Sequence, residues 1–74
     1  RILDVDTKKT YSIEKITEEL KRDSGTISFL QNHNMVPGSK VTVADSGDYS
    51  ITISVNKNEY FGIDKFIAKR VFVA

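Results

Sequence analysis

The side chains best suited to metal chemistry gather in one acidic stretch of this 74-residue chain. Glu18, Glu19 and Asp23 supply carboxylate oxygens, and hard oxygen ligands of this kind suit Mn²⁺ or Fe²⁺. Lys21 and Arg22 are interleaved with them, and their positive charges neutralise the cluster. The pattern leaves two interpretations, oxygen ligands for a metal or a solvated loop, and it favours the loop.

His33 is the one histidine of the chain, so it is the one imidazole that could act as a metal ligand or as a pH sensor. It falls in the last turn of a predicted helix, where a partial positive charge is mildly favourable. We expect His33 to lie exposed there, with ligation or pH sensing as the alternative.

No arrangement typical of an enzyme is found in the sequence. The chain has no cysteine and one histidine, and it shows neither a Ser-His-Asp order nor a phosphate-cradling run of glycines. The net charge of +1, from 11 basic and 10 acidic residues, is too balanced for a dedicated nucleic-acid binder. We therefore predict a non-enzymatic domain that makes no direct contact with nucleic acid.

Composition predicts one small folded domain over residues 1–74. Hydrophobic residues make up 39 % of the chain and there is a single proline, which argues against disorder. The absence of cysteine fits a reducing cytosol, so we expect a cytoplasmic protein. No apolar run approaches the ~20 residues of a membrane span and no signal-peptide pattern opens the chain, so we expect no membrane insertion.

Hydrophobic alternation and turn signals predict a mainly β fold with one short helix. The helix is expected from Ser24 to His33, with Asp23 or Ser24 as its cap and Asn34 ending it in the left-handed conformation. Short strands joined by tight turns suggest a small barrel, because closing a sheet covers its edges. The predicted strands after the turn at Pro37-Gly38 are 40–44, 49–55, 59–63 and 71–73, with a helical turn after Asp64.

Two stretches stay open on pattern alone. Residues 1–9 carry an apolar patch and are interpreted as the end of a linker or a short strand. Residues 10–22 fit a helix by the spacing of Ile13, Ile16 and Leu20. The β-branched and aromatic residues at the start of that stretch favour a strand instead.

Tyr11, Tyr49 and Tyr60 could form an aromatic groove for a proline-rich segment, as small barrels of this shape do. Alternation places Tyr49 on the same strand face as Ile51 and Ile53. The alternative is that each tyrosine packs its ring in the core and keeps its hydroxyl in water.

The most specific pattern in the sequence comprises Phe29-Leu30, Met35–Val41, Tyr49–Ile53, Tyr60 and Phe66–Val73. It resembles the FeoA-like domain, the SH3-like barrel of ferrous iron transport protein A. The same domain forms the C-terminus of metal-dependent regulators of the diphtheria toxin repressor type. The resemblance implies a five-stranded barrel, a strand over residues 10–16, and one helix between the first two strands. Asn34 stands where the family often has glycine.

The resemblance implies a non-catalytic regulatory domain of a Mn²⁺- or Fe²⁺-dependent transcriptional repressor. The ending Phe66–Arg70 and the leader Ile2–Asp6 look more like these regulators than like the transport protein. We then expect the DNA-binding and dimerisation domains of a homodimer to precede Arg1. The barrel would modulate metal-activated DNA binding through contacts with those domains. The alternatives are a stand-alone FeoA-type accessory protein of ferrous iron transport and a peptide-binding SH3-like module.

The resemblance also implies a metal ligand. In some of these regulators an acidic residue at the start of the barrel's helix, followed three positions later by an amide, binds an ancillary metal. Asp23 and Thr26 stand at those positions, although Thr26 lacks the amide. Glu19 and His33 are further candidate ligands, and the alternative for Asp23 is a helix cap alone. The metal, Mn²⁺ or Fe²⁺, would belong to the full-length protein, and none is expected to be required for this domain to fold.

Overall fold

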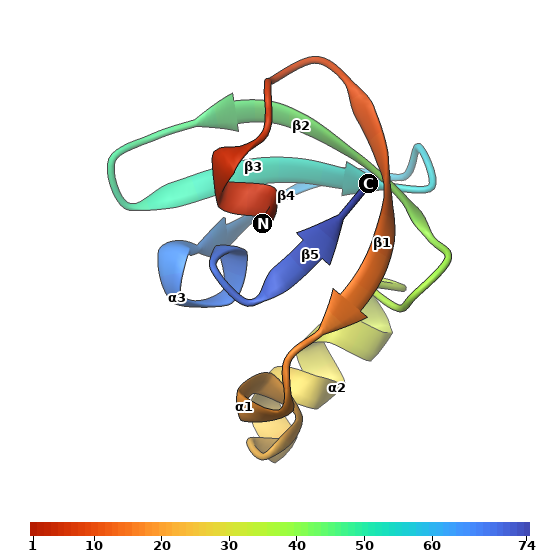
Figure 1. Cartoon of the computed structure of the whole chain (residues 1–74), viewed down its shortest axis with the longest axis vertical. Helices are drawn as coiled ribbons and strands as arrows, with labels where there is room; N and C mark the ends of the chain where they lie inside the picture. The colour runs from red at the N-terminus through yellow and green to blue at the C-terminus, as the bar shows by residue number, and fades with distance from the viewer.

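The computed structural model describes residues 1–74 and contains one five-stranded antiparallel sheet, in the order β4-β3-β2-β1-β5 (Figure 1). The first strand covers residues 10–16 and confirms the extended conformation that the family resemblance implied there. The helix that the spacing of the apolar residues suggested does not form over these residues. The strands are β1 (Thr10–Ile16), β2 (Lys40–Ser46), β3 (Ser50–Val55), β4 (Tyr60–Asp64) and β5 (Val71–Val73).

The sheet curls into a small SH3-like barrel because β1 changes partner along its length. Its first half pairs with β2, where Thr10 lies opposite Thr42. From Ile13, opposite Val73, it pairs with β5 instead, and this pairing contains a register shift between Ile13 and Lys15. Such bulges bend a strand and increase its twist, so the two ends of β1 can serve two walls of the barrel. A second shift, in β2 opposite β3, bends the next strand in the same way.

Two helices, rather than the expected one, separate the first two strands: α1 (Glu18–Lys21) and α2 (Ser24–Asn32). They pack together at one end of the molecule, beyond the end of β1 (Figure 1). The extra turn forms because Leu20 is a core residue, and a helical turn after Thr17 brings it inward. The predicted helical turn after Asp64 is present as α3 (Lys65–Ala68), with the Asp64 side chain accepting from the Ile67 backbone N–H.

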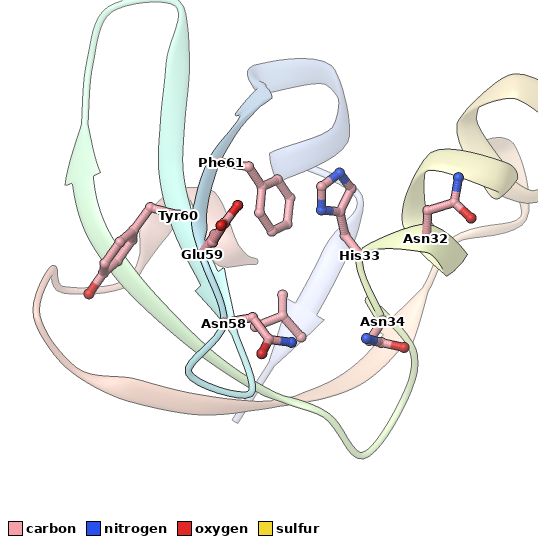
Figure 2. A pocket seen from close by; sticks show the side chains of 8 residues that line it. Asn32, His33, Asn34, Asn58, Glu59, Tyr60 and Phe61 are labelled. Carbon is pink, nitrogen blue, oxygen red and sulfur yellow. The ribbon is translucent and has the colours of Figure 1, made fainter.

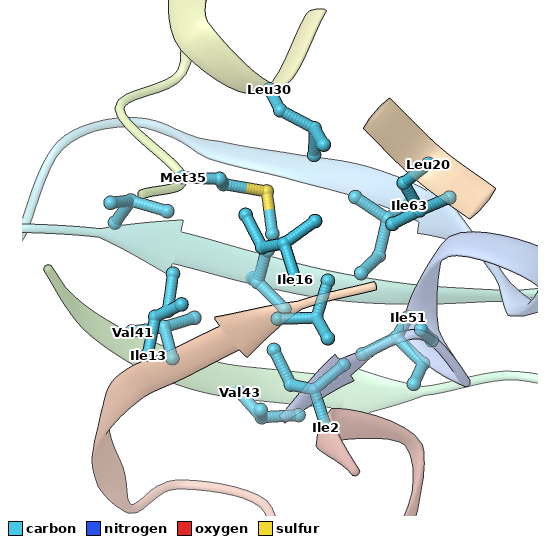
Figure 3. Packing of buried hydrophobic residues seen from close by; sticks show 14 residues of the cluster. Ile2, Ile13, Ile16, Leu20, Leu30, Met35, Val41, Val43, Ile51 and Ile63 are labelled. Atoms are coloured by element: carbon cyan, nitrogen blue, oxygen red, sulfur yellow. The ribbon is translucent and has the colours of Figure 1, made fainter. Parts of the chain in front are cut away.

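The start of the chain belongs to the folded domain. Ile2–Asp4 forms a 3₁₀ turn, η1, which packs against α3 and β5. The Ile2 side chain has no exposed surface and sits within the buried cluster (Figure 3). Both interpretations, the linker end and the short strand, are therefore wrong for Ile2–Asp4, because one buried side chain holds a 3₁₀ turn that has no periodic pattern to reveal it.

The core is a continuous apolar cluster, to which every strand and helix and the corner at Met35 contribute side chains (Figure 3). Ile51 and Ile53 point into it as alternation predicted, but Tyr49 does not, since it precedes β3 and is 87 % exposed. No helix has the length and apolar character needed to cross a bilayer. The cluster consists of Ile2, Ile13, Ile16, Leu20, Leu30, Met35, Val41, Val43, Ile51, Ile53, Val55, Ile63, Ala68 and Val71.

Three turns use residues other than glycine in the left-handed region, and one of them holds Lys8 at φ 65°. Asn34, at φ 58°, ends α2 as expected, and the N–H of Met35 then donates to the carbonyl of Leu30 at 2.8 Å. Asn56 and Lys57, at φ 54° and 63°, turn β3 into β4. Two successive positive φ values are the signature of a type I′ hairpin turn, whose twist matches that of the strands it joins. A tight turn between the predicted strands 49–55 and 59–63 was expected, but not the positive φ of Lys57.

Candidate functional site

Asp23 is the cap of α2. One of its carboxylate oxygens accepts from the backbone N–H of Thr26 at 2.8 Å and from the Thr26 hydroxyl at 2.6 Å. These hydrogen bonds stabilise the charged form and lower the pKa of the Asp23 carboxyl below its ordinary value. Thr26, in place of the family's amide, therefore completes the cap. The carboxylate that the resemblance assigned to a metal is already used in holding the helix start.

Substituting Asp23 separates capping from ligation. The lowered pKa means that the charged cap stabilises the fold above the unfolded-state pKa of about 3.9, and that this stabilisation is lost as the pH falls through the lower folded-state pKa. Asp23→Ala should lower the urea midpoint at pH 7. Asp23→Asn should keep most of that midpoint, because asparagine also caps helices, while losing the acid-dependent part of the stability. An Mn²⁺-dependent rise in the wild-type midpoint that both variants lack would instead identify Asp23 as a ligand.

Glu19 forms an ion pair with Arg70, which follows it by 51 positions in the sequence. Arg70 Nε donates to the Glu19 carboxylate at 3.0 Å, and Arg70 Nη1 donates to the carbonyl of Phe66 at 3.0 Å. The guanidinium also lies over the Phe66 ring, 3.8 Å from its centroid. One arginine thus joins α1 to the segment between α3 and β5. The remaining carboxylate of the acidic stretch, Glu18, pairs with Lys21 at 3.5 Å.

Removing Arg70 should cost more than removing the charge of its partner. Arg70→Ala loses an ion pair, a cation–π contact and a half-buried stem, and should destabilise the fold by about 1–2 kcal/mol. Glu19→Gln should cost about 0.5 kcal/mol or less, since exposed ion pairs contribute little. Lys69→Ala, at the exposed neighbouring position, is the matched control and should change the unfolding free energy by less than about 0.5 kcal/mol. Equal losses for Arg70→Ala and Lys69→Ala in urea unfolding would contradict this assignment.

His33 lies half-buried in an aromatic cluster, so the expectation of an exposed side chain was wrong. Its ring stacks on Phe61 of β4, with centroids 3.9 Å apart and planes at 22°. Phe29, one turn earlier on α2, contacts both rings at centroid distances of 4.6 Å and 5.8 Å. Figure 2 shows His33 reaching from the end of α2 toward Phe61, while Tyr60 points away. This cluster joins α2 to the outermost strand of the sheet.

Two hollows lie along β4, one at each end of the aromatic cluster, and together we call them the α2–β4 groove. The first, of about 380 Å³, is where the end of α2 faces the start of β4 (Figure 2). The second, of about 360 Å³, is where the start of α2 faces the end of β4. The first is lined by Asn32, His33, Asn34, Val55, Asn58, Glu59, Tyr60 and Phe61. The second is lined by Asp23, Gly25, Thr26, Phe29, Gly62, Ile63, Asp64 and Ile67.

Comparison with known proteins identifies the family. A protein-family model, described as the FeoA domain, matches residues 1–74. The chain belongs to the FeoA domain family. A similar solved structure is a crystal structure of an iron uptake regulatory protein, FeoA, with a TM-score of 0.78 at 23 % identity. The match covers 97 % of this chain and 91 % of that one. Among curated proteins no sequence matches significantly.

The tyrosines of this FeoA domain do not converge. Tyr11 packs against the core and its hydroxyl donates to the carbonyl of Asp6 at 3.3 Å. Tyr60 opens β4, whereas Tyr49 precedes β3 at the opposite end of the same hairpin. The predicted aromatic groove is therefore not formed.

The predicted metal ligands of the FeoA domain also lie apart. Asp23 and His33 flank the nine residues of α2, which spans about 14 Å. Glu19 faces Arg70, and no group of three or more His, Cys, Asp or Glu side chains could hold a metal ion. Within residues 1–74 these side chains therefore do not gather into one metal site.

Sequence reasoning missed the aromatic cluster of the FeoA domain. One local signal was present, because Phe29 and His33 are four residues apart on a helix and so share a face. The partner ring on β4 gave no such signal, since which strand meets that face depends on the closed barrel.

Proposed function

We propose that this FeoA domain is a non-catalytic accessory module of ferrous iron uptake, the alternative in our sequence analysis, rather than the regulatory domain of a repressor. The family match over residues 1–74 is the observation that carries the proposal. The solved FeoA chain supports it, because that chain is named for iron uptake and is matched over 91 % of its length.

The residues that suggested a repressor have structural roles here. The leader places Ile2 in the core, and the ending supplies Arg70, which holds Glu19 and the Phe66 ring. Both features are accounted for by the packing of the barrel itself. They therefore no longer favour the regulator over the transport accessory.

The proposed mode of action is contact with a partner protein, with iron as the cargo of that partner. The three predicted ligands are each engaged otherwise, in a cap, an ion pair and an aromatic stack. A barrel without converging ligands can still change a transporter's activity if it binds one of the transporter's states more tightly than another. The cytoplasmic part of a membrane iron transporter is the partner that this role requires.

The test is ferrous iron uptake in cells that lack the gene. Uptake of radiolabelled Fe²⁺ should fall severalfold and recover when the wild-type gene is restored. The transcripts of the iron-uptake genes, measured at matched cellular iron, should not rise. Unchanged uptake would refute the accessory role. Raised transcripts with raised uptake would show a repressor instead.

A further inference from the structure

The outer edge of β4 is free. β4 is the last strand on its side of the sheet, and none of the backbone hydrogen bonds made outside the regular elements involves residues 60–64. The other end of the sheet is β5, which has only three residues and has η1 packed against it. An exposed row of unpaired N–H and C=O groups is a template for one more strand, and proteins normally shorten, cover or charge such an edge.

Two hollows and an unobstructed glycine lie along β4. The stacked rings of His33 and Phe61 join α2 to the strand. One hollow of the α2–β4 groove lies on each side of this contact along β4. Gly62 is in the middle of β4, and a Cβ there would meet no heavy atom within 4 Å. Glycine inside a strand often marks a place where another backbone approaches closely.

The charge of the groove selects the partner. Asp23, Glu59 and Asp64 line it, and no lysine or arginine does. Glu59 is exposed and takes part in none of the chain's salt bridges. Lys57 and Lys65 flank β4 but line neither hollow. A basic segment is thus electrostatically complementary to the groove.

We propose that the free edge of β4 binds an extended basic segment of a partner protein, which adds a sixth strand to the sheet. Glu59 and Asp64 are five positions apart, or about 17 Å along an extended strand. The segment should therefore carry basic side chains at both ends of about six residues. Main-chain hydrogen bonds would supply affinity and the two charged ends specificity, as in other strand-addition complexes. The inference rests on the proposed role as a contact module and names the chemistry of the contacted partner.

A second copy of the chain is the competing occupant. The same three carboxylates line the groove in each copy, so pairing two β4 edges brings two acidic grooves together. A basic segment from another protein carries no such repulsion.

The test is an NMR titration of the ¹⁵N-labelled 74-residue chain with three peptides. The first is a six-residue peptide whose first and last residues are lysine and whose four central residues alternate between valine and threonine. The second has glutamate at each end. The third is the lysine peptide N-methylated at alternate residues, which removes its strand hydrogen bonds. The lysine peptide should shift amides of residues 59–64 and of α2. Its dissociation constant should be about tenfold lower than that of the glutamate peptide, as expected for two exposed charge pairs.

A matched pair of variants controls for net charge. Glu59→Lys should abolish the preference for the lysine peptide, whereas Glu14→Lys, on the exposed part of β1, should retain it. Shifts confined to β5, equal binding of the N-methylated peptide, or no shift at millimolar peptide would overturn the proposal. Dimerisation through β4 in sedimentation experiments would assign the edge to a second copy. The iron-uptake experiment is independent of every one of these outcomes.

Discussion

Ile2→Ala should destabilise the FeoA domain by about 2–4 kcal/mol. Ile2 has no exposed surface and lies in the core cluster although it is the second residue of the chain. Truncating it removes buried methyl groups and leaves a cavity that η1 can only partly close. At typical values of 0.05–0.15 kcal/mol per residue, a chain of 74 residues has roughly 4–11 kcal/mol of stability. One substitution near the terminus should therefore remove a large share of it.

The control for Ile2 is an apolar residue on the surface. Val36 is 42 % exposed, and Val36→Ala should change the unfolding free energy by less than about 0.5 kcal/mol. Urea unfolding followed by circular dichroism measures both variants. If Ile2→Ala were as stable as Val36→Ala, the first residues would be a dispensable linker, one of the two interpretations that the sequence left open.

Local patterns predicted the parts of the fold that local forces decide. Alternation in β3 located Ile51 and Ile53 because one face of a strand must be buried. Asp23 and Asn34 marked the two ends of α2, since a cap and a left-handed residue act within one turn. The segment containing Ile2 was missed because its burial depends on α3 and β5, which follow at the other end of the chain.

The candidate site was harder to predict for the same reason. The Glu19 carboxylate contacts the guanidinium of Arg70, 51 positions away, and no spacing in the sequence predicts that contact. His33 likewise appeared exposed until the closed barrel placed Phe61 against it. Residue types indicated what chemistry was available, but the barrel decided which groups meet. The candidate functional site is therefore the α2–β4 groove, and not the metal ligand set that the sequence suggested.

Phe61→Ala should give the second large effect, a loss of about 2–3 kcal/mol of stability. Phe61 is only partly buried, which reduces the cost below that of a fully buried phenylalanine. Its ring nevertheless contacts both His33 and Phe29, and its removal breaks the link between α2 and β4. Amide hydrogen exchange in α2 should accelerate along with the global loss, because the helix loses its contact with the sheet.

The neighbouring Tyr60 is the matched control for Phe61. It is on the same strand, is 61 % exposed and points away from the cluster (Figure 2), so Tyr60→Ala should cost less than about 1 kcal/mol. A double-mutant cycle with His33→Ala isolates the stack between His33 and Phe61, for which we expect a coupling of about 0.5–1.5 kcal/mol. A coupling near zero would mean that the two rings contribute to stability independently of each other. In that case Phe61 would contribute by burial alone, and α2 would be held in place by Leu30 and the rest of the core.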